Sequence, residues 1–292
     1  MTAEGSPQPP THAAPLAAVT APAPQVADSP GGPLAMPETV SVVGVPLALT
    51  DYARMLELID AHVARRQRGY VCVCNVHTVM VADEDPEIRA ALLGSSVNVP
   101  DGQPLVWAIN ALGRPLHDRV YGPELMWRGC AHAAEVGQRL YLYGGRNQGA
   151  LVQLSLNLRQ HHPGIQIVGG YSPPHRPLTD EERESVIEEI NRSRADVVWV
   201  GIGVPKQEKW MAEMREHLEA PMLLGVGAAF DFHAGLVPQA PRLLQDAGLE
   251  WAFRLVQEPQ RLWRRYLRYN PRFVVAFARQ FARHLRASRG AR

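Results

Sequence analysis

Asp101, a carboxylate at the end of a short apolar run, is one residue of this sequence that could do chemistry. Asp101 and Gly102 follow Val97–Val99 and Pro100 directly, which is typical of a strand that ends in a turn. A carboxylate in that position could act as a general base and take a proton from a hydroxyl nucleophile. Taken alone, an Asp-Gly pair is more often simply a turn, so the catalytic interpretation needs support from other residues.

Two glycine-rich turns at the ends of apolar runs are typical of phosphate-binding loops. Residues 195–207 read ADVVWVGIGVPKQ and residues 140–149 read LYLYGGRNQG, so each apolar run leads through glycines into a helix. The first backbone N–H groups of such a helix can bind a phosphate or diphosphate. Because ligands of open α/β sheets lie beyond the carboxyl ends of the strands, the two turns together favour a nucleotide-type ligand.

Polar residues end two further apolar runs. Asn75 and His77 close the run that begins at Tyr70, where their side chains would reach a cleft, although a lone His is more often structural. The segment Asp-Phe-His at 231–233 follows Met222–Val226, and it forms either a structural turn or a cleft wall.

The sequence predicts no bound metal, no other cofactor and no disulfide. The acidic run Asp83-Glu84-Asp85 could suggest the metal-binding motif of many sugar transferases, but it lies in a stretch with helical spacing beside Pro86. We interpret it as a solvated turn of a helix. Cys72, Cys74 and Cys130 are too few for a disulfide scaffold and are expected to be reduced core thiols.

Short apolar runs alternate with amphipathic stretches, and these elements must position the candidate residues. The expected strands are Val40–Val45, Tyr70–Asn75, Val97–Val99, Arg139–Tyr143, Gln166–Gly170, Val197–Gly201 and Met222–Val226, and the expected helices include Asp51–Arg66, Val79–Leu93, Asp180–Arg192 and Lys206–Glu216. Repeated strand–helix units predict an α/β fold, a Rossmann-like, mostly parallel sheet with helices on both faces. This catalytic domain is expected to cover residues 37–248.

The two ends of the chain differ in composition from this domain. Residues 1–36 hold eight Pro and no Lys, Arg or aromatic residue, which predicts a disordered leader. The 30 basic and 29 acidic residues of the chain nearly cancel, yet residues 254–292 hold eleven Arg and a single acid, Glu258. Residues 249–292 are therefore expected to form a basic helical appendage, with two helices or a kink at Asn270–Pro271.

The appendage is predicted to bind the inner face of the cell membrane. Arg272, Arg279, Arg283 and Arg286 flank the apolar positions Phe273, Phe277, Phe281 and Leu285. Such basic amphipathic helices associate with anionic membrane surfaces. The longest apolar runs are strand-sized, so no helix is expected to span a bilayer, and no secretory signal is evident. The protein is expected to be cytoplasmic and peripherally associated with the membrane.

Seven segments occur together, in order, between Val40 and Tyr269. They are CNVHTVM (74–80), PDG (100–102), RVYGPELM (119–126), LYGG (142–145), GIGVPKQEKW (201–210), GVGAAFDFHAG (225–235) and APRLLQDAGLEWAFRLVQEPQRLWRRY (240–266). This combination resembles the WecG/TagA/CpsF family of bacterial glycosyltransferases. The resemblance implies inverting, metal-independent transfer of a sugar, typically N-acetylmannosamine or a related hexose, from a UDP-sugar. The implied acceptor is a sugar on undecaprenyl diphosphate, in the synthesis of cell-surface polysaccharide or a teichoic-acid linkage.

The resemblance also implies roles for individual residues. Asp101 takes the place of the general base, Arg119 and Gln207 those of substrate-binding side chains, and Arg254, Arg261 and Arg264 those of basic residues that close over the donor diphosphate. The other substrate-binding candidates are Asn75, His77, Gly102, Gly122, Gly145 and Glu208. Val73 stands where many relatives have Thr, so a hydroxyl near the nucleophile is missing or replaced. The sequence leaves open whether an apolar face of the appendage is buried in a homo-oligomer.

Two other functions compete with glycosyl transfer. A nicotinamide-dependent oxidoreductase should carry an acidic ribose ligand about 20 residues after its first glycine turn. The strand after Gly144-Gly145 instead ends in Gly169-Gly170-Tyr171, and Lys206 stands where the dinucleotide fingerprint has its third glycine. A nucleic-acid binder could use the Arg-rich tail, but the acidic body and the apolar residues of the tail favour a membrane surface over a duplex. No nucleic-acid partner is therefore predicted.

Overall fold

The computed structural model describes residues 34–246 and 248–290, except for the side chains of residues 242, 246, 261 and 289. The predicted leader lies outside these residues, apart from its last three positions, and stays a prediction. Within the described part, helices and strands alternate as the sequence predicts.

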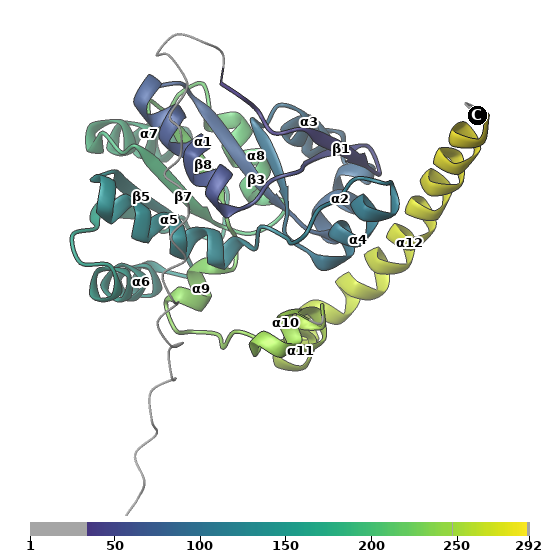
Figure 1. The fold of residues 1–292 in the computed structure, drawn as a ribbon. Helices are drawn as coiled ribbons and strands as arrows, with labels where there is room; N and C mark the ends of the chain where they lie inside the picture. Colours follow the sequence, from purple (N-terminus) through teal and green to yellow (C-terminus); the bar gives the residue numbers. More distant parts are fainter. Residues whose placement is uncertain (1–33, 247, 291–292) are drawn as a thin grey trace, which may run out of the picture. The chain divides into compact units, whose positions relative to one another are not determined.

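Six parallel strands form the central sheet in the order β4-β3-β8-β7-β5-β6 (Figure 1). They are β3 (Gly69–Cys74), β4 (Val97–Pro100), β5 (Arg139–Gly144), β6 (Gln166–Tyr171), β7 (Val197–Gly201) and β8 (Met222–Gly225). Every residue of β3 is buried, because both faces of a parallel sheet are covered. The predicted α/β fold with a Rossmann-like, mostly parallel sheet is confirmed.

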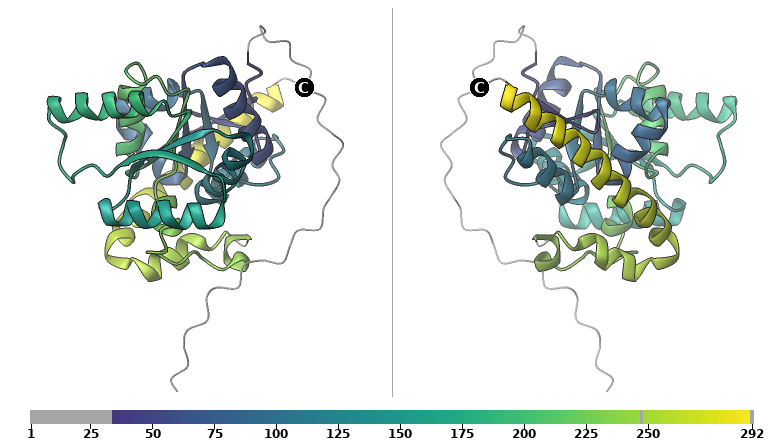
Figure 2. Two further views of the ribbon diagram at one scale, coloured as in Figure 1. Left: turned by 90° about the vertical axis from the view of Figure 1, so that its left-hand side faces the viewer. Right: turned by 90° about the vertical axis from the view of Figure 1, so that its right-hand side faces the viewer.

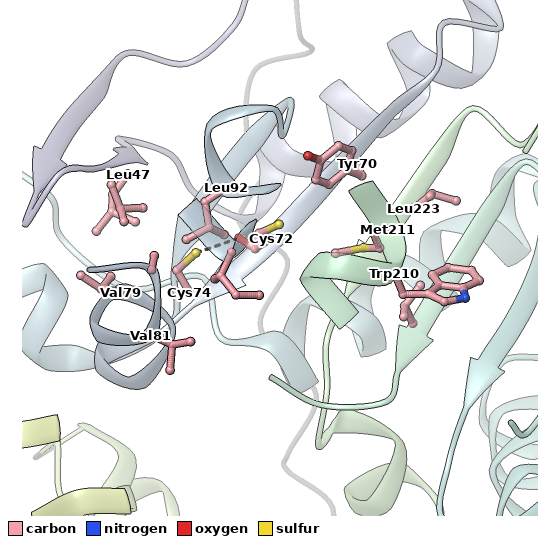
Figure 3. Close-up of a cluster of buried hydrophobic side chains, with 14 of the residues drawn as sticks. Leu47, Tyr70, Cys72, Cys74, Val79, Val81, Leu92, Trp210, Met211 and Leu223 are labelled. Atoms are coloured by element: carbon pink, nitrogen blue, oxygen red, sulfur yellow. Dashed lines mark hydrogen bonds between the residues drawn. The ribbon is translucent and has the colours of Figure 1, made fainter. Parts of the chain in front are cut away.

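Helices cover both faces of this sheet and form two apolar cores. One face carries α1 (Tyr52–Arg65), α5 (Gly122–Val136), α6 (Gln148–His161) and α9 (Ala229–His233), and the other carries α2 (Val76–Glu84), α3 (Pro86–Leu93), α4 (Gln103–Ala111), α7 (Asp180–Ser193) and α8 (Lys206–Met214). Because side chains alternate along a strand, Cys72 and Cys74 enter the second of these cores (Figure 3). Both are free, buried thiols, as predicted, and so is Cys130.

The segment predicted as one strand over Val40–Val45 is a hairpin. Strand β1 (Thr39–Val42) pairs antiparallel with β2 (Val45–Ala48). The turn between them has Val43 at φ 50° and Gly44 at φ 81°. A β-branched residue rarely adopts a positive φ, so the apolar pattern alone gave no sign of this turn.

The segment predicted as one helix over Val79–Leu93 is two helices. Asp85 lies between α2 and α3, and its carboxylate accepts hydrogen bonds from the backbone N–H groups of Glu87 and Ile88. Pro86 then begins α3, where the missing proline N–H needs no partner.

Three helices follow the α/β body at its C-terminal side. They are α10 (Arg242–Asp246), α11 (Glu250–Gln257) and α12 (Pro259–Gly290). Helix α12 runs unbroken through Pro271, so of the two alternatives predicted at Asn270–Pro271, two separate helices is wrong, and a kink stays a prediction. Pro271 cannot donate to the carbonyl of Leu267, but both residues are exposed, so water can solvate that carbonyl.

Helix α12 packs across α2 and the β1–β2 hairpin (Figure 2). Phe273 is buried in the core on that side, and Arg268 and Arg272 both pair with Glu84 at the end of α2. Farther along, the Gln280 side chain accepts a hydrogen bond from the Val43 N–H and donates one to the Ser41 carbonyl. No helix within residues 34–246 and 248–290 is long and apolar enough to cross a bilayer.

Candidate active site

A cleft of about 680 Å³ lies between the carboxyl ends of β3 and β4 and the helices α11 and α12. We call it the Asp101 cleft. Its polar lining includes Asn75, His77, Asp101, Arg119, Glu250, Arg254 and Arg265, and its apolar lining includes Trp107, Ala111, Tyr269, Phe273, Phe277 and Phe281. Sequence segments that are far apart thus meet around one carboxylate.

Backbone groups hold Asp101 at the floor of this cleft. Its N–H donates to the carbonyl of Cys74 at 2.7 Å, which ties the end of β4 to the end of β3. Its Oδ1 accepts a hydrogen bond of 2.8 Å from the N–H of Gly122, the first residue of α5. Burial raises the pKa of Asp101 to about 6, although the Arg119 charge opposes this. Such a carboxylate is ionised at neutral pH and more basic than an exposed one.

An ion pair between Arg119 and Glu250 forms the wall beside Asp101. Arg119 Nη2 lies 2.7 Å from Glu250 Oε2, and the two side chains are only 11% and 10% exposed. Arg119 Nη1 donates to the backbone carbonyl of Asp101 at 3.2 Å, and the guanidinium lies over the Tyr121 ring. Glu250 was not among the predicted site residues. Its one signal in the sequence was its place in the family-like segment 240–266.

Asn75, His77 and Gly102 line the Asp101 cleft, as their positions at strand ends predict. The Asn75 side chain caps α2 by accepting a hydrogen bond from the Thr78 N–H. The His77 ring packs edge-on against Tyr269 at 4.9 Å between centroids. Burial, with the nearby Arg265 charge, lowers the pKa of His77 to about 4, so the imidazole is neutral at physiological pH.

The three proximal arginines of the appendage differ in position. Arg254 lines the Asp101 cleft, and its guanidinium lies 5.5 Å from the centre of the Phe232 ring. Arg264 is exposed over Trp263 and does not line the cleft, whereas the neighbouring Arg265 does. The side chain of Arg261 is outside the described residues. Arg265 could have been found from its spacing of four and eight residues from Tyr269 and Phe273.

A second cleft, of about 820 Å³, lies beyond the ends of β5 and β7. We call it the glycine cleft, because Gly145, Gly201, Gly203 and Gly227 line it. Basic side chains surround the glycines, namely Arg146, His175, Arg176, Arg183, Lys206 and Lys209. Gly144, at φ 136°, lets the β5 turn approach the β7 turn, since a Cβ there would lie 2.5 Å from the Gly201 carbonyl carbon. The arrangement can bind a phosphorylated ligand on backbone N–H groups.

Helix α9 lines the glycine cleft and contacts an arginine of the Asp101 cleft. Asp231 lines the glycine cleft and pairs with Arg146 at 3.0 Å, while the adjacent Phe232 meets Arg254 of the Asp101 cleft. Arg146 also lies 3.9 Å from Glu258 at the end of α11. Of the two interpretations of segment 231–233, the cleft wall is therefore the one observed for Asp231.

Gln207 and Glu208 lie beneath the glycine turns, and neither lines a described cleft. Gln207 is 1% exposed, and its Nε2 donates to Glu208 Oε1 at 3.1 Å. A Cβ on Gly227 would lie 3.3 Å from Gln207 Oε1, so this amide fills the space under the β8 turn. Burial raises the pKa of Glu208 to about 7. Direct substrate binding by either residue stays a prediction, and so does that by Gly122, which holds Asp101.

The acidic run at 83–85 has partners within the protein. Glu84 pairs with Arg268 and Arg272, and Asp85 caps α3 and pairs with Lys209 at 3.0 Å. In residues 34–246 and 248–290, no three His, Cys, Asp or Glu side chains are grouped so that they could hold a metal ion.

The arginines predicted to face a membrane also differ. Arg272 is bound to Glu84, so it helps to dock α12 on α2. Arg279, Arg283 and Arg286 are exposed, and none has an ion-pair partner within the described part of the chain. The aromatic positions between them face the cleft: Phe277 and Phe281 line it and stack in a column with Phe273. Membrane association itself stays a prediction.

A comparison with protein families identifies the family of the chain. The model of the family described as "Glycosyl transferase WecG/TagA/CpsF family" matches residues 40–287, which is most of the chain. That match covers Asp101, both clefts and nearly all of α12. It supports an enzyme that joins a sugar donor to an acceptor, and it leaves the nicotinamide-dependent alternative without support. The chain belongs to the WecG/TagA/CpsF family of glycosyltransferases.

Proposed function

We propose that the protein transfers a hexose, such as N-acetylmannosamine, from a UDP-sugar to a sugar on a polyprenyl diphosphate. The product serves cell-surface polysaccharide or teichoic-acid-linkage synthesis. One observation carries the proposal: Asp101 lies where a cationic wall and an apolar wall of the same cleft meet. A ligand with an anionic diphosphate and a hydrocarbon chain fits such a cleft, whereas a free sugar would leave the apolar wall uncovered.

The donor nucleotide is assigned to the glycine cleft. Backbone N–H groups near Gly145 and Gly203, with Lys206 at the start of α8, suit a diphosphate. Helix α9 lines this cleft, and its Phe232 contacts Arg254, so a donor bound against α9 would bring its diphosphate toward Arg254 and its sugar toward Asp101.

Asp101 then acts as the general base of a single displacement. It takes the proton from the acceptor hydroxyl while the hydroxyl oxygen forms a bond to the anomeric carbon of the donor sugar. The bond from that carbon to the diphosphate oxygen breaks on the opposite side, so the configuration inverts and UDP leaves. Arg254 and Arg265 supply charge-assisted hydrogen bonds to the departing diphosphate. No metal is needed for this charge stabilisation.

The acceptor chain is assigned to the apolar wall along α4 and α12. Trp107 and Ala111 of α4 face Phe277 and Phe281 of α12 across the cleft. Arg279, Arg283 and Arg286 extend the same helix with positive charge, which suits a surface of anionic headgroups. The enzyme would thus take its lipid-linked acceptor while peripherally bound to the cytoplasmic membrane.

A screen of purified protein against a panel of UDP-sugars, with and without a short-chain polyprenyl-diphosphate-sugar acceptor, tests this function. UDP release that depends on both one donor and the acceptor, with a β-for-α change at the anomeric carbon or the reverse, is the expected result. Release of UDP without acceptor, or transfer with retained configuration, would contradict it. Asp101→Asn serves as the inactive control.

A further inference from the structure

Two carboxylates line the Asp101 cleft within the described residues, and the second is Glu250. It comes from α11, at the start of the C-terminal helices, whereas Asp101 and Arg119 come from the α/β body. The proposed displacement uses one carboxylate as its base, so it leaves Glu250 without a role. A buried carboxylate this close to a reacting group needs an explanation, because burial of a charge is costly unless a partner compensates it.

We propose that Glu250 is a positioning residue for the transfer: by binding Arg119, it fixes that guanidinium beside Asp101 and keeps the Asp101 carboxylate basic. The inference rests on the proposed function, since it takes Asp101 as the base. It also means that α11 must be docked before the base has its full strength.

The geometry around Arg119 supports the positioning role. One nitrogen contacts Glu250 at 2.7 Å, another donates to the Asp101 backbone carbonyl at 3.2 Å, and the face of the guanidinium covers the Tyr121 ring. These three contacts fix the orientation of the Arg119 guanidinium. The carboxylate of Asp101 receives one hydrogen bond in the described structure, from the Gly122 N–H to Oδ1. Its Oδ2 is thereby left for the acceptor hydroxyl.

Glu250 offsets the effect of two neighbouring cations, Arg119 and Arg254, on the pKa of Asp101. Arg119 precedes α5 and Arg254 lies on α11, and both favour the ionised, weakly basic form of Asp101. Glu250 opposes them and raises the Asp101 pKa. Other titratable neighbours are Tyr52 of α1, Tyr121 before α5 and Cys74 of β3, all of which are neutral at physiological pH because burial raises their pKa values. From α2 and α12, the neutral His77 and the cationic Arg265 also line the cleft. Without Glu250, the positive charges of Arg119 and Arg254 would act on Asp101 unopposed.

The test is Glu250→Gln in the full chain, with kcat/KM measured against pH on a short-chain acceptor. Glutamine keeps the size and a hydrogen-bond acceptor but removes the charge, so the acid limb should move to lower pH. The weaker base should lower kcat by about 3- to 30-fold, less than the ~10²–10⁴-fold loss typical of removing a general base. The matched control is Glu124→Gln, which removes an acid from an exposed ion pair with Arg128 outside the cleft and should leave both quantities unchanged.

A second readout does not depend on turnover. Titration of ¹³C-labelled Asp carboxyls by NMR should give a lower midpoint for Asp101 in Glu250→Gln than in the wild type. Glu250→Asp keeps the charge but, with its shorter side chain, places it farther from Arg119, so the Asp101 midpoint should be intermediate. This variant tests the proposal if Glu250→Gln does not fold. The proposal would be overturned by a loss of kcat that is equal at all pH values together with an unchanged Asp101 midpoint. Glu250 would then only stabilise the fold through its ion pair. Failure of the wild type to transfer any sugar would contradict the proposed function instead, and the Asp101 titration would still decide the role of Glu250.

Discussion

The reactivity of Asp101 depends on a few atoms around one carboxylate. Burial raises its pKa to about 6, so the base is protonated below that pH and ionised above it. We therefore expect kcat/KM to rise with pH through about 6 and to level off near neutrality. Asp101→Asn keeps the shape and removes the basicity, which should lower turnover by ~10²–10⁴-fold.

Donor affinity is the control for that variant. Calorimetric binding of the UDP-sugar should survive in Asp101→Asn, because the nucleotide is assigned to the glycine cleft. Near-normal turnover would exclude Asp101 as the base. A joint loss of donor binding and turnover would indicate that the variant damages the fold instead.

Gly122 positions Asp101, because its backbone N–H donates a hydrogen bond to the carboxylate. There is little room for a side chain at this glycine. A Cβ there would lie 3.3 Å from both the Val226 carbonyl oxygen and Val73 Cγ1. Gly122→Ala should therefore shift the first turn of α5, cost about 1–3 kcal/mol of unfolding free energy and lower kcat. Thermal unfolding and turnover measure the two effects.

Gly149→Ala is the matched control, since this glycine also lies in the first turn of a helix, α6, with only the Asn147 side chain near its missing Cβ. It should be neutral or slightly stabilising, because Ala has the higher helix propensity. Equal stability and activity in the two variants would show that the space around Gly122 does not matter.

Among the elements, α12 combines three tasks along one helix. Its first turns bring Arg265 and Tyr269 into the cleft, its middle packs Phe273 and Gln280 against the body, and its end carries exposed arginines. Deleting everything after Pro271 would remove Phe273, Phe277 and Phe281 from the cleft wall as well as the basic end. A test of membrane binding must therefore replace charges and leave the aromatic residues in place.

The triple variant Arg279→Gln, Arg283→Gln and Arg286→Gln makes that separation. Each basic residue near an anionic surface contributes about 1 kcal/mol, so co-sedimentation with anionic vesicles should fall by more than tenfold at low salt. Turnover on a short-chain acceptor should persist, because none of the three lines the cleft. Unchanged sedimentation would show that the distal arginines do not bind the membrane. DNA binding that is lost with the same charges would favour a nucleic-acid partner instead.

Elements with strong local signals could be predicted from the sequence, and those set by distant contacts could not. The apolar run of β3 and the Thr179–Glu182 capping box of α7 are local, and both elements lie within one residue of their predicted bounds. Helix α12 continues through Pro271, with the contact of Arg268 with Glu84 before that residue and the contacts of Arg272 with Glu84 and of Gln280 with the β1–β2 hairpin after it.

The same distinction applies to the site. Asp101 could be found because a strand end and a turn are adjacent in the sequence. Glu250 could not, since its significance lies in Arg119, 131 positions away. Arg264 and Arg265 are neighbours in the sequence, and only the direction of the helix decides that Arg265 enters the cleft.

At the scale of the whole molecule, we predict catalysis without a metal, because two of the acids that could suggest a metal site are already paired with basic side chains. Glu84 and Asp85 are engaged by Arg268, Arg272 and Lys209, and the diphosphate is assigned to arginines. Turnover should therefore be unchanged by EDTA and by later addition of Mg²⁺ or Mn²⁺. An enzyme of known Mg²⁺ dependence, treated in parallel, shows that chelation was complete. Loss of activity in EDTA with recovery on adding either ion would refute the prediction.

The division of the cleft between two distant parts of the chain has a consequence for protein synthesis. All six strands of the main sheet lie between Gly69 and Gly225, so the complete sheet emerges from the ribosome before Glu250 does. The body that carries Asp101 and Arg119 can therefore begin to fold in a nascent chain while the segment that supplies Glu250, Arg254 and Arg265 is still inside the ribosome. We expect a ribosome-bound chain to have a folded body and no sugar-transfer activity, and the enzyme to become competent only once α11 and α12 have been released.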